Sequence, residues 1–149
     1  MKLFRRIAAL ALALVVVAML GISASAAGSD ETINGDFGAF AHFEWSLTRS
    51  TARGEASFHD NGGDIELTVH NIWIEYTQVN ESTKERVTTT ARETVQKNGT
   101  IPANTALVKE VPAASPWYFL NATFNYDATY IANGVVDCYL FSGPKALHT

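Results

Sequence analysis

The four histidines of this chain are the first residues to test for metal chemistry: His42, His59, His70 and His148. His42 and Glu44 are two residues apart, so in a β-strand both side chains point to the same face. A zinc site needs three or four converging ligands, and a third would have to come from His59 or His70 on a neighbouring strand. Polar residues on the wet face of a strand explain the same pair. The sequence therefore predicts no metal site and no cofactor.

Carboxylates could instead support acid–base catalysis, which needs two of them in one cleft. Four carboxylates fall within apparent strands: Glu66, Glu75, Asp127 and Asp137. Glu66 and Glu75 alternate with apolar neighbours and are expected to face solvent, and Asp137 is expected at a sheet rim near Tyr130. No nucleophile elbow, phosphate-binding glycine loop or zinc-protease helix motif occurs in the sequence. We therefore predict no catalytic residue, and a secreted hydrolase remains the second alternative function.

Cys138 is the only cysteine, so no disulfide can form within one chain. No neighbouring residue in the sequence forms a recognisable activating partner for a thiolate. We expect a buried, inert thiol on the strand face opposite the aromatic residues. An intermolecular disulfide is the alternative.

A possible ligand-binding surface begins at Trp117 and Phe119, which share strand parity with Asn121, Thr123 and Asn125. Large rings beside amides and hydroxyls are typical of surfaces that recognise sugars or peptides. The predicted ligand-binding residues are therefore Trp117, Phe119 and Asn121. Cover by a loop or by a second sheet would also explain the two rings.

Residues 117–142 show the clearest local structure in the chain, a β-hairpin with Asn133-Gly134 at a type I′ turn. Counting back from the turn, the expected cross-strand pairs are Ala132–Val135, Tyr130–Asp137, Ala128–Tyr139 and Tyr126–Phe141. One face then carries Tyr118, Leu120, Phe124, Tyr126, Tyr139 and Phe141. So much aromatic surface requires cover from another sheet, because a lone hairpin is unstable in water.

The rest of the chain also alternates with the strand period. We expect strands at 37–48, 56–58, 65–79 and 105–111, with a bulge or corner near His70 and Asn71, where the apolar parity changes. Residues 85–95 fit a Thr-rich strand, and the spacing of Val87, Ala91 and Val95 also fits a short helix. Turns are expected at 60–64 and 97–99, and an edge or loop segment at 101–104. Seven or eight short strands predict an all-β, antiparallel β-sandwich, with a small β-barrel as the alternative.

Residues 1–26 have the three parts of a secretory signal peptide. Lys2, Arg5 and Arg6 precede the apolar run 7–20, and Ala24-Ser25-Ala26 follows as a cleavage site. The run is shorter than the roughly 20 residues of a transmembrane helix, and its composition looks bacterial. We expect export by the general secretory route, no transmembrane segment after cleavage, a flexible lead-in at 27–36 and a single domain at 37–149.

The charge of the chain narrows the class of partner. The net charge is −4, and loss of the leader's Lys2, Arg5 and Arg6 would leave −7. Such a charge argues against nucleic acid and anionic membranes as partners. We expect a secreted or cell-surface-associated, non-catalytic binding module for an extracellular glycan, wall polymer or protein, with self-association as a further option. A small secreted effector, bacteriocin-like or membrane-damaging, is the first alternative.

Overall fold

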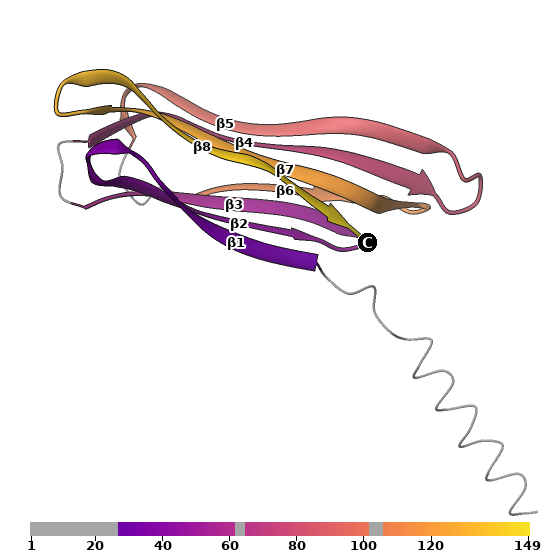
Figure 1. The fold of residues 1–149 in the computed structure, drawn as a ribbon. Coiled ribbons are helices and arrows are strands. Elements are labelled where there is room, and N and C mark those ends of the chain that lie inside the picture. The colour runs from indigo at the N-terminus through magenta and orange to yellow at the C-terminus, as the bar shows by residue number, and fades with distance from the viewer. Residues whose placement is uncertain (1–26, 62–64, 102–105) are drawn as a thin grey trace, which may run out of the picture.

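The computed structural model of the chain describes residues 27–61, 65–101 and 106–149 as an antiparallel β-sandwich, which confirms the predicted fold class. The first sheet has the order β1 (Ala27–Asn34), β2 (Ala39–Leu47), β3 (Thr51–Asp60) and β6 (Ala106–Pro112). The second has the order β5 (Arg86–Ile101), β4 (Ile65–Asn80), β7 (Trp117–Ala132) and β8 (Val135–His148). Figure 1 shows the two sheets stacked as layers. In the described residues no helix is long and apolar enough to cross a membrane.

The core lies between the sheets and is rich in aromatic rings. In β2, alternate residues from Ala39 to Leu47 are buried, which is the pattern that the strand period predicts. Phe43 stacks on Tyr126 across the sheets, with ring centroids 5.5 Å apart. The largest fully buried side chains are Tyr126, Tyr130, Phe43, Phe58, Phe119, Phe124, Leu47, Leu67, Ile72, Ile74 and Leu140. Burial of such side chains is the main favourable term in folding.

Two glycines allow close approach around this core. A Cβ on Gly54 would lie 3.2 Å from the Ile72 side chain of the opposite sheet. A Cβ on Gly35 would lie 2.5 Å from the Tyr130 hydroxyl. That hydroxyl accepts a hydrogen bond from the Asp36 N–H at 2.8 Å and donates one to the Asp36 carbonyl at 3.2 Å. Gly35 therefore makes room for the one polar end of a buried tyrosine.

The expected flexible lead-in is wrong, because Ala27–Asn34 forms β1 and pairs with β2 along its whole length. Ile33 packs against the core. The Lys145 ammonium on β8 lies 2.7 Å from a Glu31 carboxylate oxygen, and this hydrogen bond lowers the pKa of Glu31. Main-chain pairing with β2, one inward apolar residue and the contacts of Glu31 with β8 thus hold an edge strand whose other residues are mostly small and polar.

The hairpin and its turn are confirmed, but the register of the returning strand is not. Asn133 and Gly134 have φ of 50° and 77°, and Ala132 pairs with Val135 as expected. β8 then contains one extra residue before Cys138, so Tyr130 pairs with Cys138 and the expected Tyr130–Asp137 pair is wrong. Such a bulge moves every later side chain to the other face.

The shift reverses which β8 residues face the core. The expected Ala128–Tyr139 and Tyr126–Phe141 pairs are also wrong, since Leu140 and Ser142 occupy those positions. Cys138 is buried, as expected, but it lies in the core rather than on the opposite face. Tyr139 and Phe141 are instead 56% and 47% exposed. The side chain of Asp137 lies outside the described residues.

β4 and β5 form one long antiparallel pair. The predicted bulge in β4 is present, between Leu67 and Val69 rather than at 70–71, and β4 stays in one sheet. Residues 86–95 form a strand that pairs with residues 70–79 of β4, which decides between strand and helix. The turn expected at 97–99 is wrong because β5 continues to Ile101, and 102–105 lie outside the described residues.

His70 is a completely buried histidine that lies against the edge of Tyr126, with ring centroids 5.3 Å apart. Within the described part of the chain, neither His70 nitrogen nor the Tyr126 hydroxyl has a hydrogen-bond partner. Burial lowers the pKa of His70 from 6.5 to about 4, and burial, with a smaller effect of the Asp127 charge, raises the pKa of Tyr126. Both side chains are therefore neutral at pH 7.

The turn conformation gives a first prediction. Asn133→Pro should destabilise the domain by more than about 1 kcal/mol, because proline cannot adopt the positive φ that this position requires. Asn133→Gly is the matched control and should stay close to wild type, since glycine adopts positive φ freely. Urea unfolding of the three proteins measures both effects. Equal stability of the proline variant and wild type would contradict the turn.

His70 gives a second prediction, on pH. Between pH 6.5 and 4 the unfolded chain binds a proton on His70 that the folded chain excludes, so acid should lower the stability. The pKa difference corresponds to about 3 kcal/mol lost by pH 4. His70→Leu should lose this part of the pH dependence. Unfolding at pH 7 and pH 4 tests it, and parallel losses in wild type and variant would contradict it.

Candidate functional site

Three loops meet at one end of the sandwich, which we call the loop end: the β2–β3 connection (48–50), the β4–β5 turn (81–85) and the β6–β7 connection (113–116). The carboxyl terminus lies at the same end (Figure 1). Main-chain hydrogen bonds tie these loops to one another. Ala113 N–H donates to the Ser50 carbonyl at 2.8 Å, and Glu81 N–H donates to the Pro116 carbonyl at 2.8 Å. The loop end is therefore fixed by the backbone before any ligand arrives.

Trp117 lines two hollows at the loop end. The apolar hollow, of about 200 Å³, is lined by Tyr76, Gln78, Val87, Pro112, Ala114 and Trp117. The polar hollow, of about 340 Å³, is lined by Arg49, Ser50, Glu81, Ala113, Ser115, Pro116, Trp117 and Tyr118. A ligand in either hollow would touch the same indole.

The apolar hollow opens because the two sheets differ in length. β6 ends at Pro112, whereas β4 and β5 continue past it toward the β4–β5 turn (Figure 1). Val87, near the start of β5, is consequently 41% exposed. Tyr76 is held in place at the floor by an edge-to-face contact with Phe119, with ring centroids 5.3 Å apart.

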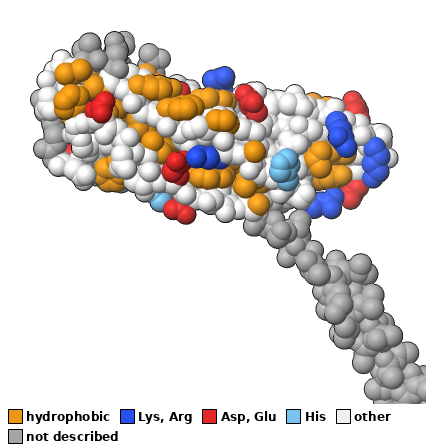
Figure 2. All heavy atoms as spheres, in the orientation of Figure 1, with side chains coloured by type: hydrophobic (Ala, Val, Ile, Leu, Met, Phe, Trp, Pro, Cys, Tyr) orange, Lys and Arg blue, Asp and Glu red, His pale blue; other side chains and the backbone are white. Residues whose placement is uncertain are grey.

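The polar hollow has an ion pair in its wall. The Arg49 guanidinium lies 4.2 Å from the centre of the Tyr118 ring, and one of its nitrogens lies 3.6 Å from a Glu81 carboxylate oxygen. The Lys84 ammonium donates to the Glu81 carbonyl at 2.6 Å. Figure 2 shows hydrophobic side chains among charged ones of both signs at this end of the molecule. The charges of the wall are thus paired with each other.

The three predicted binding residues are placed differently by the structure. Trp117 lines both hollows, but Phe119 is completely buried and the expectation that its ring is exposed is wrong. Asn121 is half-buried and pairs with Thr77 and His148, away from the residues that line the hollows. The cause is an extra residue at Leu120, which shifts the β4–β7 register between Thr77 and Gln78.

Arg49, Tyr76 and Tyr118 are the site residues that the sequence analysis missed. They are far apart in the chain and come together only through the sandwich topology. Tyr118 was expected in the core, and the shift at Leu120 turns it outward toward Arg49. In the sequence, the one local indication that loops meet at the loop end was the presence of turn-forming residues around Arg49 and around Glu81.

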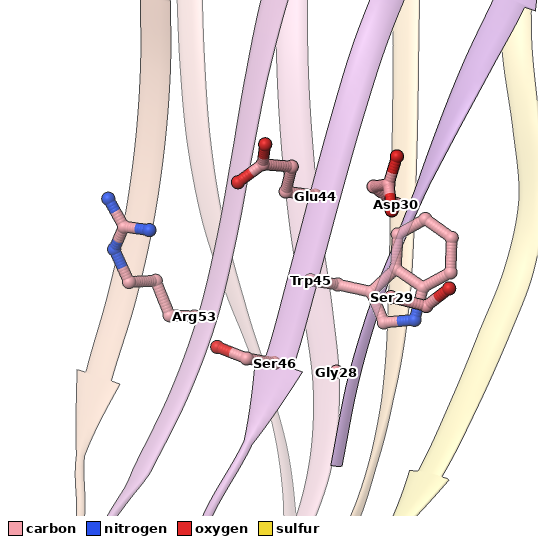
Figure 3. Close-up of a pocket in the computed structure, with 7 residues that line it drawn as sticks. All are labelled: Gly28, Ser29, Asp30, Glu44, Trp45, Ser46 and Arg53. Atoms are coloured by element: carbon pink, nitrogen blue, oxygen red, sulfur yellow. The ribbon is translucent and has the colours of Figure 1, made fainter. Parts of the chain in front are cut away.

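A third hollow, of about 420 Å³, lies on the outer face of the first sheet (Figure 3). It is lined by Gly28, Ser29, Asp30, Glu44, Trp45, Ser46 and Arg53. Arg53 forms ion pairs with Glu55 and Glu110, outside this lining. The Asp30 and Glu44 side chains are more than half exposed, so the burial that tunes a catalytic carboxyl group is missing here.

The histidines do not converge. His42 Nε2 lies 3.1 Å from a Glu44 carboxylate oxygen, as their spacing suggested. His59 stacks on Phe40 with centroids 5.0 Å apart, and His70 is buried between the sheets. Within the ranges that the structure describes, no group of three or more His, Cys, Asp or Glu side chains could hold a metal ion.

Fold and loop end together define a β-sandwich domain with a preformed, open site at one end. Comparison with known proteins finds no matching family model and no similar curated protein. The function is therefore argued from the loop end itself.

The different burial of Trp117 and Phe119 leads to a third prediction. Phe119→Ala should cost about 3–5 kcal/mol of stability, as expected for a buried phenylalanine. Trp117→Ala should cost less than half of that, because its ring lines open hollows. Urea unfolding of both variants gives the comparison. A Trp117 variant as unstable as the Phe119 variant would show that the indole is part of the core.

Proposed function

We propose that this protein is a secreted or cell-surface-associated, non-catalytic binding module that holds an extracellular ligand at the loop end. The observation that carries the proposal is the position of Trp117 between two open hollows whose loops are tied together by main-chain hydrogen bonds. Rings beside polar groups in a preformed hollow are typical of binding sites. The ligand class is a glycan, a wall polymer or a protein.

The fold holds the loops of the candidate site in fixed positions, which supports binding to a preformed site. Arg49 illustrates this, because its carbonyl accepts the Phe119 N–H at 2.9 Å while its guanidinium covers the Tyr118 ring. The main chain of Arg49 is therefore held by β7, while its guanidinium lines the polar hollow. A site that is ordered in advance loses little conformational entropy on binding.

The leader supports an extracellular setting. Residues 1–26 have the charge and apolar pattern of an export signal. The expected net charge of −7 keeps the exported domain soluble and repels anionic polymers.

Binding can be tested directly, which gives a fourth prediction. The protein is screened against immobilised glycans, wall polymers and extracellular proteins, with Trp117→Ala alongside. Tyr139→Ala is the matched control, because it removes an exposed ring from the outer face of the second sheet, far from the loop end. We expect Trp117→Ala to weaken binding by at least about tenfold.

The control should bind as wild type does. Both variants binding with wild-type affinity would contradict the proposed site. Phe119 must be left intact in this experiment, since loss of a core ring would destabilise the domain and lower binding for an unrelated reason.

A further inference from the structure

We propose that the ligand is an uncharged glycan chain that crosses Trp117 and places one sugar unit in each of the two hollows. This inference rests on the proposed function and narrows it to one ligand class. Trp117 is common to both hollows, so a ligand that fills both must pass over its ring. The hydrophobic face of a pyranose ring stacks on indole, and its hydroxyl groups remain free for hydrogen bonds.

The charges at the site favour an uncharged ligand. The apolar hollow has no charged residue in its lining, and the polar hollow has one of each sign, Arg49 and Glu81. These two pair with each other at 3.6 Å. Both side chains are at least half exposed, so separating this pair would cost little. The linings of the two hollows nevertheless carry no net charge, so they offer a charged ligand no net electrostatic attraction. A neutral ligand needs none.

In the loops at the site, the main chain argues against a peptide that binds as an added strand. Such a peptide needs free N–H and C=O groups on the protein. At the loop end the Glu81, Ala113 and Phe119 N–H groups already donate to carbonyls of the neighbouring loops, and the Trp117 N–H donates to the Ala114 carbonyl at 2.8 Å. Side chains are left to make the contacts: the hydroxyls of Ser50 and Ser115 in one hollow and the Gln78 amide in the other.

The sizes of the hollows indicate a chain rather than a single compact ligand. Small-molecule sites usually have about 300–1000 Å³. The apolar hollow, of about 200 Å³, lies below this range and the polar hollow, of about 340 Å³, lies at its lower limit. Each has room for one ring-sized unit, so strong binding requires at least two linked units.

The test is calorimetric titration of the full chain with cello-, xylo- and chito-oligosaccharides of increasing length, from the monosaccharide upward. Polygalacturonate oligomers and a proline-rich peptide are the charged and peptide probes. We expect at least one neutral series to bind, with affinity rising at least about tenfold from the monosaccharide to the short oligomers and then levelling off. Raising the salt from about 50 mM to about 500 mM should change this affinity less than about twofold.

Ala114→Phe places a ring in the apolar hollow and should reduce the affinity for short oligomers to that for the monosaccharide. Ala146→Phe is the control, because Ala146 is an exposed alanine on β8 that pairs with Thr123, outside both hollows. Binding that does not depend on length, or an Ala114→Phe variant that binds as the control does, would overturn the two-hollow arrangement.

The outcomes also separate this inference from the proposed function. If only polygalacturonate, the peptide or another partner binds, and binding still requires Trp117, the assignment of an uncharged glycan is wrong and the binding module stands. If a neutral oligosaccharide binds equally well without Trp117, both are wrong. Neutral, length-dependent binding that is lost in Trp117→Ala supports both.

Discussion

The aromatic layer between the two sheets is the interaction on which the rest of this structure depends. Phe43 stacks on Tyr126 and Phe58 lies against Tyr130, so rings from both sheets fill one continuous core. Gly54 leaves room for this layer, since a Cβ there would lie 3.2 Å from the Ile72 side chain and 3.5 Å from the Phe43 ring. Replacing any of these rings by a small residue would leave a cavity that the long strands cannot close.

The loop end follows from where this layer stops. β4, β5 and β7 each have 16 residues, whereas β6 has seven, so the first sheet cannot cover the second along its full length. The uncovered inner face becomes the floor of a hollow, and Trp117, the first residue of β7, stands at its margin. Phe119, two residues further on, already lies in the core. A residue that lines the candidate site and a core residue are therefore neighbours on one strand.

Much of the fold could be predicted because alternation is a local property. The turn at Asn133 and Gly134 and the inward face of β2 follow from residue types that lie next to each other in the chain. What failed were the faces beyond each bulge, at Leu120 in β7 and before Cys138 in β8. A change of apolar parity predicted the bulge in β4. The position of a bulge also depends on how a strand fits its neighbours, and the bulges in β7 and β8 were therefore missed.

Of the residues at the candidate site, only Trp117 could be predicted from the sequence, because contacts between strands that are distant in the chain bring the others together. Arg49 and Tyr76 reach the loop end through topology, and no spacing in the sequence connects them with Trp117. β1 is the opposite case, since it contains little more than Ile33 to indicate a strand. Its pairing with β2 and the contact between Glu31 and Lys145 are decided by the rest of the sandwich.

The placement of β1 and β8 has a mechanical consequence. The start of β1 and the carboxyl terminus lie at the same end of the molecule (Figure 1). The two strands are linked across the sheets by Glu31 and Lys145. Tension applied between these two points would load the backbone bonds of β1 one pair after another, beginning where Ala27 meets Leu47. β1 would therefore detach one residue pair at a time, at far lower force than is needed to shear all of its hydrogen bonds at once.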